Sequence, residues 1–422
     1  MYPQVLFKNR KPDRPATLAE YRESGGYQAL SEILAEGAPN AILEAVKASD
    51  LKGRGGAGFP VAKKWSTIPE DAPDRRYLLV NADEMEPGTF KDREMIHADP
   101  HMLIEGAVLA AYATGCGKGL LFIRPSYDTS AEILEHALDT ARQAGYLGEN
   151  ILGSGFTFHL DIHRSGGRYI CGEGTAILNA TMGKRPNPKN PPPFPTDKGL
   201  WGLPTLVHNV ETLVCLPHIV RNGGEWFKNL AKSDDGSGTK LYCVSGRVNR
   251  PGCYELPLGT QLSEIIEDFG GGMIGGNQFK ACLPGGASTH YLTAENYEVG
   301  MDPVSLSNAG YRLGTAAIIV FDETCCMVDA TLNLTTFFVR ESCGWCTPCR
   351  EGLRYIQDLL WRIENGTGED AYIPRLQEFA GYLKNAYCAF ALGAAGPIES
   401  LAAHFEDEIR AHLADGKCPF KH

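Results

Sequence analysis

The sequence lacks any long hydrophobic run. No apolar stretch in its 422 residues approaches the roughly 18 residues of a membrane-spanning helix, so we expect no direct membrane insertion. Residues 1–10 also lack the hydrophobic core of a signal peptide. An excess of positive charge is missing as well, because 40 Lys and Arg stand against 51 Asp and Glu, a net charge of −11. This balance argues against a nucleic-acid partner.

The cysteine pattern of a secreted, disulfide-bonded protein is absent too. The chain has 13 cysteines, an odd number, and most of them stand singly in apolar segments. We interpret Cys171, Cys215, Cys243 and Cys282 as reduced core residues. This usage favours a reducing compartment and predicts a cytoplasmic protein.

One group of cysteines is dense. Cys343, Cys346 and Cys349 follow a Cys-x-x-Cys-x-x-Cys repeat, and Cys388 lies further along the chain. This spacing lets one loop present three thiolates to an iron–sulfur cluster, which needs four. A tetrahedral zinc site more typically takes its ligands two and two, and unligated thiols are a further alternative. The pattern favours a [4Fe–4S] cluster over both.

A glycine-rich loop occupies residues 53–60, and Lys63, Lys64 and Trp65 follow it. Glycines let backbone amides approach a ligand closely, and such a nest attracts phosphate. The loop satisfies G-x-G-x-x-G, but a helical pattern precedes it where the dinucleotide fingerprint requires a strand. We therefore do not predict a standard Rossmann dinucleotide site. A phosphate-binding loop and a flexible surface turn both stay open.

Alternating buried strands and helices predict a largely parallel sheet with both faces covered. The strand at 77–80 ends in the run 81–89, which carries Asp83, Glu84 and Glu86. Polar groups at the carboxyl end of such a strand lie where open α/β sheets bind ligands. A solvated turn is the alternative for these carboxylates.

Two later segments also suggest ligand contacts. Residues 165–175 form a second glycine-rich loop before a predicted helix, a suitable place for an anion or a flavin ring. Residues 186–195 are dense in proline and predicted to be rigid. Phe194 in this segment could stack on a planar ligand, although a linker is the simpler interpretation.

The C-terminal half divides at the polar run 233–238, the predicted domain boundary. The segments 240–246 and 252–256 are typical of a hairpin, and a helix near 262–269 and a strand at 315–321 complete a small module without a ligand signature. We interpret it as a scaffold or docking surface. From about residue 327 the pattern is helical, and three apolar helical faces follow, the last of them at 398–413. Together with the segment before Cys343 they predict a four-helix bundle capped by the cysteine loop.

In this order, these segments resemble the NADH-oxidising flavoprotein subunit of bacterial respiratory complex I, NADH:quinone oxidoreductase. The resemblance covers nearly the whole chain and rests on the first glycine loop with Lys64 and Trp65, on residues 81–93, 169–173 and 209–213, and on the cysteine set. It implies an α/β multidomain protein. Its parts would be a Rossmann-like FMN-binding α/β domain with an N-terminal helical segment at 1–232, a ubiquitin-like β-grasp module at 239–324 and a helical [4Fe–4S] domain at 325–422.

The resemblance also implies the site residues. The positions that would surround FMN are Gly53, Arg54, Gly55, Gly56, Ala57, Gly58, Lys64, Asn81, Asp83, Glu84, Tyr169, Gly172, Glu173 and Asn209. Phe59, Glu86 and Phe194 would approach NADH, with a positioning or tuning role for Glu86. Hydride transfer from NADH to FMN would precede single-electron steps to the cluster, so the chemistry belongs to the cofactors.

The implied partners are a small thioredoxin-like [2Fe–2S] subunit and a large iron–sulfur subunit of the peripheral arm. They would carry electrons toward quinone on the cytoplasmic face of the inner membrane. A close alternative is the diaphorase subunit of a soluble NAD-linked hydrogenase or formate dehydrogenase.

Four departures from the family pattern motivate a second alternative, an electron-relay subunit with weakened nucleotide binding. Gly174 replaces a glutamate, Pro191 replaces a basic residue, His208 replaces an asparagine, and residues 124–127 differ from the usual Arg-Gly-Glu-Tyr. The loss of a carboxylate at Gly174 also predicts relaxed selectivity between NADH and NADPH.

Overall fold

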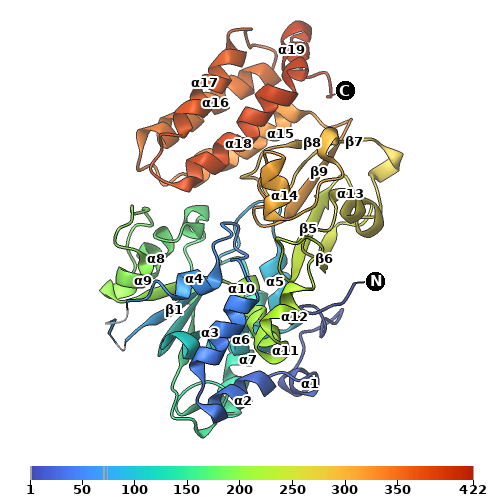
Figure 1. Cartoon of the computed structure of the whole chain (residues 1–422). Coiled ribbons are helices and arrows are strands. Elements are labelled where there is room, and N and C mark those ends of the chain that lie inside the picture. Colours follow the sequence, from blue (N-terminus) through green and yellow to red (C-terminus); the bar gives the residue numbers. More distant parts are fainter. Residues whose placement is uncertain (1, 70–71, 74, 422) are drawn as a thin grey trace.

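The computed structural model describes residues 2–69, 72–73 and 75–421 of the chain. Figure 1 shows an α/β part at the bottom, a smaller part built on a second sheet beside it (residues 239–322, called the small-sheet part below) and a helical part at the top. No helix within the described residues combines the length and apolar character that crossing a bilayer requires.

The first sheet is parallel throughout, with the strand order β3-β2-β1-β4. Its strands are β1 (Tyr77–Ala82), β2 (Lys118–Ile123), β3 (His159–Arg164) and β4 (Thr205–Asn209). The inner strand β1 carries the continuous buried run Leu78–Val80, as expected for a strand covered on both faces. The predicted parallel α/β sheet is therefore confirmed.

Helices flank this sheet, and its two faces belong to different cores. Successive side chains of a strand point to opposite faces. Leu78 and Val80 accordingly pack in the core around the helices of the α/β part, whereas Leu79 joins the core of the helical part. The helices are α1 (Leu18–Glu23), α2 (Gln28–Glu36), α3 (Pro39–Ala48), α4 (Val61–Trp65), α5 (Lys91–Ala98), α6 (Pro100–Thr114), α7 (Asp128–Gln143), α8 (Ala176–Thr181), α9 (Pro195–Lys198), α10 (Val210–Val214), α11 (Leu216–Asn222) and α12 (Gly224–Lys228).

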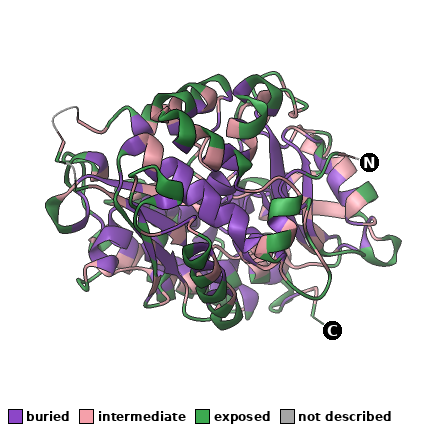
Figure 2. Cartoon of the chain, turned by 90° about the horizontal axis from the view of Figure 1, so that it is seen from below, coloured by how far each residue is buried: buried purple, intermediate pink, exposed green. Residues whose placement is uncertain are grey.

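Helix α6 is the most deeply buried of these elements. Nearly all of its residues are inaccessible to solvent, and it contacts α3, α7, α10 and α11. Figure 2 shows the same arrangement across the molecule, with buried residues gathered inside and exposed ones on the outer helices. A helix that is apolar on all sides must be surrounded by other elements.

The second sheet has the order β6-β5-β9-β7-β8. Its strands are β5 (Thr239–Gly246), β6 (Gly252–Pro257), β7 (Phe279–Leu283), β8 (Leu292–Thr293) and β9 (Ala317–Asp322). The predicted hairpin is confirmed, since β5 and β6 pair antiparallel, while β5 and β9 pair in parallel. The expected helix is present as α13 (Leu262–Glu264) and its continuation to Phe269. A second helix, α14 (Pro303–Asn308), was not predicted; Asp302 caps it by accepting hydrogen bonds from two backbone amides.

The C-terminal part is helical, as predicted from about residue 327. It consists of α15 (Met327–Glu341), α16 (Thr347–Glu364), α17 (Tyr372–Leu383), α18 (Ala389–His404) and α19 (Glu406–Asp415). Helix α15 packs against α16 and α18, and α17 lies between α16 and α18 (Figure 1). The prediction of a third helical face at 398–413 was wrong in one respect, since these residues do not form one continuous helix. The chain leaves helical geometry at Phe405 (φ −131°), so this face is divided between α18 and α19.

Candidate functional site

The structure brings the four cysteines of the dense group around one small cavity. Cys343 and Cys346 lie in the loop between α15 and α16, Cys349 lies in the first turn of α16, and Cys388 is the residue before α18. Four thiols from two separate segments of the chain therefore face a common space. This is the arrangement that a four-thiolate cluster requires.

The spacing of these thiols distinguishes a cluster from a single zinc ion. Thiolates around a tetrahedral zinc ion lie about 3.8 Å apart, because each Zn–S bond is about 2.3 Å. No three of these four sulfurs lie within 4.8 Å of one another; among the described residues, the one group of ligand atoms that close together is elsewhere in the chain. A cubane binds each thiolate to a different iron and so needs wider spacing. The cavity therefore fits an iron–sulfur cluster better than zinc.

The surroundings of the thiols are apolar. Burial, with a smaller contribution from the neighbouring thiols, raises the pKa of Cys349 to about 12 and that of Cys388 to about 11. Such thiols become thiolates only when bound cations compensate the charge, as iron would. The guanidinium of Arg350 is bonded to Gly344 O (3.0 Å) and paired with Glu351 (2.8 Å), so it fastens the cysteine loop.

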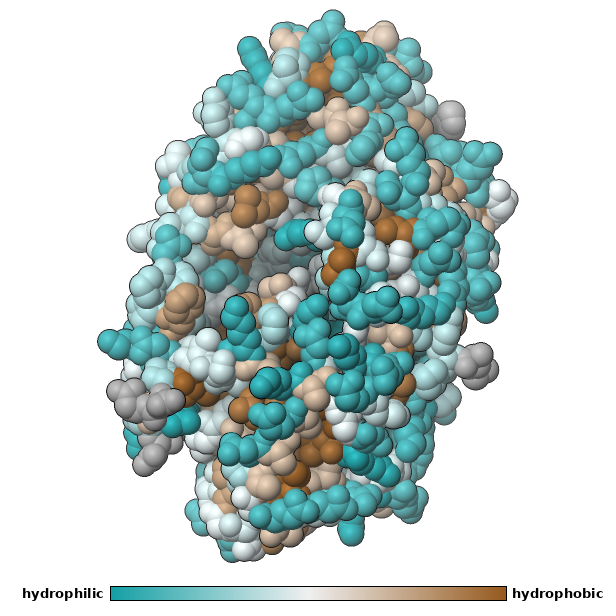
Figure 3. Space-filling view, in the orientation of Figure 1, coloured by the Kyte–Doolittle hydropathy of each residue, from teal (hydrophilic) through white to brown (hydrophobic). Residues whose placement is uncertain are grey.

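A larger cavity of about 390 Å³ opens between the carboxyl edge of the first sheet, the second glycine loop, the small-sheet part and α18. Figure 3 shows a hollow on this face of the molecule, between the helical part and the α/β part. The predicted residues that line the cavity are Gly55, Gly56, Ala57, Asn81, Asp83, Glu84, Glu86, Tyr169, Gly172, Glu173 and Asn209. Its volume is typical of a cofactor site.

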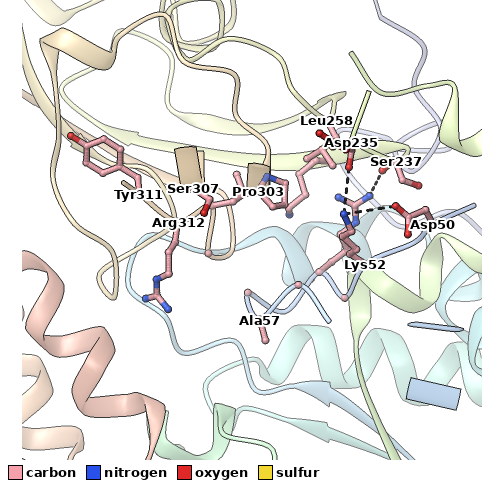
Figure 4. Close-up of a pocket in the computed structure, with 17 residues that line it drawn as sticks. Asp50, Lys52, Ala57, Asp235, Ser237, Leu258, Pro303, Ser307, Tyr311 and Arg312 are labelled. Atoms are coloured by element: carbon pink, nitrogen blue, oxygen red, sulfur yellow. Dashed lines mark hydrogen bonds and ion pairs between the residues drawn. The ribbon is translucent and has the colours of Figure 1, made fainter. Parts of the chain in front are cut away.

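Three other predicted residues line a neighbouring cavity. Gly53, Arg54 and Gly58 face a space bounded on its other side by residues of the small-sheet part, including Tyr311 and Arg312 (Figure 4). Both cavities share part of the glycine loop among their lining residues. The Arg54 guanidinium does not extend into the large cavity, because it donates to the backbone carbonyl of Ser237 at 2.5 Å.

The remaining predicted contacts lie outside both cavities. Lys64 Nζ donates to Val207 O at 3.0 Å, and burial lowers the pKa of this lysine. Phe59 is 43% exposed and Phe194 is 58% exposed. The structure therefore does not bring these three side chains together with the other predicted residues, and their contacts with cofactor or substrate stay predictions.

Glu84 is a fixed acceptor on the sheet edge. Its carboxylate accepts hydrogen bonds from the backbone amides of Asp92 (3.0 Å) and Arg93 (3.2 Å) and from the Tyr127 hydroxyl (3.1 Å). Burial and then the nearby Asp92 charge raise the pKa of Glu84 to about 7. Arg124 donates to the Glu84 carbonyl at 2.5 Å. Arg124 and Tyr127, which hold Glu84 in place, match the family pattern, and only Pro125 and Ser126 between them depart from it.

Asp83 offers an unused acceptor. One carboxylate oxygen accepts a hydrogen bond from Ser165 Oγ at 2.8 Å, and the other is buried without a protein partner. Burial raises the pKa of Asp83 to about 6. A buried polar atom without a partner is costly unless a ligand or water bonds to it. The cavity thus presents an acceptor suited to a ligand N–H or O–H group.

Glu86 links the sheet edge to the small-sheet part. It accepts a hydrogen bond from the Tyr169 hydroxyl and another from the Ser288 amide at 2.7 Å. Burial raises the pKa of Glu86, although these two donors oppose the shift. A Cβ on Gly286 would lie 2.6 Å from Glu86 Cγ, so glycine is required for this approach.

A buried charge network supports the floor of the large cavity. Lys91 Nζ lies 2.7 Å from Asp92 Oδ1, 2.8 Å from Asn209 Oδ1 and 3.1 Å from Glu211 Oε2, and Lys240 also pairs with Glu211 at 2.6 Å. Asn209 in turn donates to Asp92 at 2.6 Å and caps α10. Because each charge is paired, these buried groups hold Asn209 in one orientation.

The small-sheet part contributes to the cavity, contrary to the expectation that it carries no ligand signature. Gly285, Ser288, Arg312, Gly314 and Thr315 all line the large cavity. Only the pair Gly285-Gly286 and the single Gly314 gave a local signal, and both lie far in sequence from the other lining residues. The interpretation of this module as only a scaffold or docking surface was therefore incomplete.

Two known proteins match this chain over nearly its full length. It is 46% identical over 421 residues to the F 2 subunit of NADH-quinone oxidoreductase of Rhizobium meliloti (strain 1021), covering 100% of both chains. It is also 46% identical to the F subunit of NADH-quinone oxidoreductase of Escherichia coli (strain K12), covering 99% of this chain and 93% of that relative. The chain belongs to the family of NADH-quinone oxidoreductase F subunits.

Family models and a solved structure extend this result. Residues 46–218 match the Nuo51 FMN-binding domain, residues 329–412 the NADH-ubiquinone oxidoreductase-F iron-sulfur binding region, and residues 241–291 the SLBB domain. A chain of an NAD⁺-reducing [NiFe]-hydrogenase in the H₂-reduced state superposes with a TM-score of 0.84 at 35% identity, covering 95% of this chain and 67% of that one. The predicted NADH dehydrogenase class, with electrons passing from NADH through FMN to a [4Fe–4S] cluster, is confirmed.

Two departures from the family pattern have clear places in this structure. Gly174 lines the large cavity, and a Cβ there would meet no atom within 4 Å. His208 is buried and accepts a hydrogen bond from Trp65 Nε1 at 2.8 Å. Burial lowers the pKa of His208, so it stays neutral and acts as a packing partner of the tryptophan.

Proposed function

We propose that the large cavity binds the FMN ring system and that the small cavity binds the [4Fe–4S] cluster. One observation carries this assignment: Ile170 and Phe390 line both cavities. The two cofactors would then be separated by little more than these shared side chains. Such proximity suits electron transfer from one to the other.

The residues of the chain would bind and orient the cofactors. The amides of the glycine loop at Gly55–Ala57 would bind phosphate, as backbone nests do. The free Asp83 oxygen would accept a hydrogen bond from the bound ligand, and Glu86, held by Tyr169, would position the nicotinamide. FMN supplies the chemistry, because it accepts two electrons as a hydride and releases them singly. Cys343, Cys346, Cys349 and Cys388 would hold the cluster.

The domain limits and subfolds belong to the same proposal. The chain would consist of an FMN domain at 1–232, a β-grasp module at 239–324 and a helical cluster domain at 325–422. The second sheet supports the β-grasp assignment, since its first and last strands, β5 and β9, lie parallel at its centre. Packing of α15–α18 against one another supports a four-helix bundle.

The partners are proposed from the family. A small [2Fe–2S] subunit and a large iron–sulfur subunit would receive the electrons and pass them toward quinone on the cytoplasmic face of the membrane. A diaphorase role is the second candidate, favoured by the likeness to the NAD⁺-reducing [NiFe]-hydrogenase. Purification of the chain from its host together with its partners would distinguish the two roles. Nickel in the purified complex would indicate the diaphorase of a [NiFe]-hydrogenase.

The test is anaerobic purification of the protein with its small partner, followed by visible and EPR spectra before and after NADH is added. NADH should bleach the flavin and generate the signal of a reduced [4Fe–4S] cluster. In Cys388→Ala the flavin should still bleach, but the cluster signal should disappear. Cys282→Ala removes a buried thiol from β7, outside both cavities, and should leave both signals unchanged.

Two results would contradict the proposal. A cluster signal that persists in Cys388→Ala would remove this residue from the ligand set. A flavin that NADH does not bleach would instead favour the electron-relay alternative with weakened nucleotide binding.

A further inference from the structure

A second group of ligand-type side chains lies in the helical part, away from the cluster cavity. Cys326 precedes α15, Glu364 ends α16, His412 lies in α19, and Cys418 lies in the C-terminal segment. One ligand atom from each lies within 4.8 Å of all the others. Glu364, His412 and Cys418 are buried, and Cys326 is half-buried.

The distances match a single tetrahedral ion. Cys326 Sγ lies 3.3 Å from His412 Nε2 and 3.4 Å from Glu364 Oε2, and these last two atoms are 3.1 Å apart. Ligand atoms around tetrahedral zinc are separated by about 3.3–3.8 Å, given bonds of about 2.0–2.3 Å. Only a small expansion would admit the ion.

The histidine is already oriented for such a role. Its Nδ1 lies 2.7 Å from the backbone carbonyl of Glu408, to which the Nδ1–H donates. In the neutral imidazole, the form that binds a metal ion, this bond fixes the tautomer and directs the Nε2 lone pair at the two other ligand atoms. A second bond of this kind accompanies most metal-binding histidines.

The charges at the site are also largely offset. Two thiolates and the Glu364 carboxylate carry three negative charges, and a divalent ion leaves one of them uncompensated. Lys421 Nζ lies 2.9 Å from Glu364 Oε1, the oxygen that does not face the thiol and the imidazole, and 3.3 Å from Asp329 Oδ1. It therefore places a positive charge beside the site, which it shares with Asp329. The divalent ion and this lysine therefore offset most of the negative charge that the buried ligands carry.

We propose that Cys326, Glu364, His412 and Cys418 bind a structural zinc ion. Thiolates and an imidazole select zinc over magnesium or calcium, which prefer oxygen ligands. All four positions of the tetrahedron are filled by protein, as in structural rather than catalytic zinc sites. Binding converts two thiols to thiolates, so at least two protons leave as the ion enters.

The position of the site in the fold indicates what the ion does. The cysteine cavity lies at the opposite ends of α15 and α16 from this group, and these helices have 15 and 18 residues. At 1.5 Å per residue the two sites are about 20–27 Å apart, too far for a place between flavin and cluster. The ion instead fastens α19 and the C-terminal segment to the ends of α15 and α16.

The test uses the full-length protein loaded with FMN and iron–sulfur cluster. Elemental analysis should find about one zinc per chain, and zinc-edge X-ray absorption should find two sulfurs near 2.3 Å and two N or O atoms near 2.0–2.1 Å. Cys418→Ser and His412→Gln should each lose at least nine-tenths of the zinc. Their iron and flavin contents should stay at the wild-type level, because the cluster is distant.

Cys325→Ser is the matched control, since this thiol adjoins Cys326 but bonds to Asp322 instead and should keep its zinc. Zinc surrounded by four sulfurs would place the ion in the cluster cavity and overturn the proposal. Three other results would also overturn the proposal. Wild-type protein could take up no zinc when one equivalent is added anaerobically, or this group of ligands could hold iron in place of zinc. The protein as purified could also contain a disulfide between Cys326 and Cys418.

Discussion

At the scale of single residues, the buried pairing of Glu211 with Lys91 and Lys240 has the largest consequence. The three side chains are no more than 1% exposed. Burial alone raises the pKa of Glu211, but the two ammonium charges more than offset this and bring it to about 2. Removal of the carboxylate would leave two lysines buried next to each other.

We expect Glu211→Gln to lower the free energy of unfolding by about 3 kcal/mol at pH 7, from a pKa of 4.5 in the unfolded chain and about 2 in the folded one. A depressed carboxyl pKa contributes stability that is complete above the unfolded value and lost as the pH falls. The difference from wild type should therefore shrink between about pH 5 and pH 2, as the pH falls through the unfolded and then the folded pKa. Urea titrations at several pH values measure it. Exposed Glu44→Gln is the control, and an equal effect of both substitutions would contradict the assignment.

Gly174 tests substrate selectivity at the same scale. A side chain at this position would extend from the cavity wall without a clash. Gly174→Glu should reduce kcat/KM for NADPH about tenfold relative to NADH, a difference of about 1.4 kcal/mol, because the carboxylate repels a 2′-phosphate. Gly174→Gln, with the same size and no charge, should leave the ratio unchanged. A ratio that moves equally in both variants would show that size rather than charge decides.

At the scale of elements, the close crossing of α6 and α10 positions Asn209 at the cavity. A Cβ on Gly106 would overlap the Leu213 carbonyl oxygen, so α10 can pack here only against glycine. The side chain of Asn209 caps α10 at its first turn. A displacement of α10 would therefore move a predicted FMN contact.

Gly106→Ala should lower stability by about 3 kcal/mol through overpacking and reduce the FMN retained after purification. The same substitution at Gly381 in α17 meets no atom within 4 Å and should raise stability by up to about 1 kcal/mol, since alanine favours helices. Thermal unfolding and flavin content measure both effects. Equal behaviour of the two variants would show that the crossing is less tight than described.

At the scale of the whole molecule, the helical part and the first sheet share a core. Leu79 and Phe122 of the sheet belong to the same buried cluster as Leu353 and Leu360 of α16. The Tyr169 amide also donates to Glu341 at the end of α15 at 3.0 Å. These contacts join the two predicted cofactor sites into one packed body.

We therefore expect flavin release and cluster loss to occur in the same thermal transition. Flavin fluorescence and the visible absorbance of the cluster, recorded in one anaerobic melt, should give coincident midpoints, as cooperative unfolding requires. Midpoints separated by more than about 5 °C would mean that the helical part unfolds independently; one kcal/mol shifts a midpoint by only a few degrees in a chain of this size.

The sequence predicted the elements whose residues carry a local signal. The buried run of β1 and the apolar faces of α16 and α17 were identified correctly. Strand β3, with the sequence HLDIHR, was not predicted, because it lies at the sheet edge and has only one buried residue. Helix α14 was missed because its six residues are too few to show a periodic pattern.

The sequence by itself favoured the [4Fe–4S] cluster through the cysteine spacing, and it indicated FMN through the resemblance of its motifs to a known family. Cysteine spacing and glycine loops are local properties of the chain, so they can be recognised without knowing which segments pack together. Only the tertiary structure decided which carboxylates face the cavity, that Ser288 and Arg312 join them, and that Ile170 and Phe390 stand between the two sites. It also decided that His412 and Cys418 meet Cys326 and Glu364. These contacts join residues far apart in the chain, and packing, not spacing, brings them together.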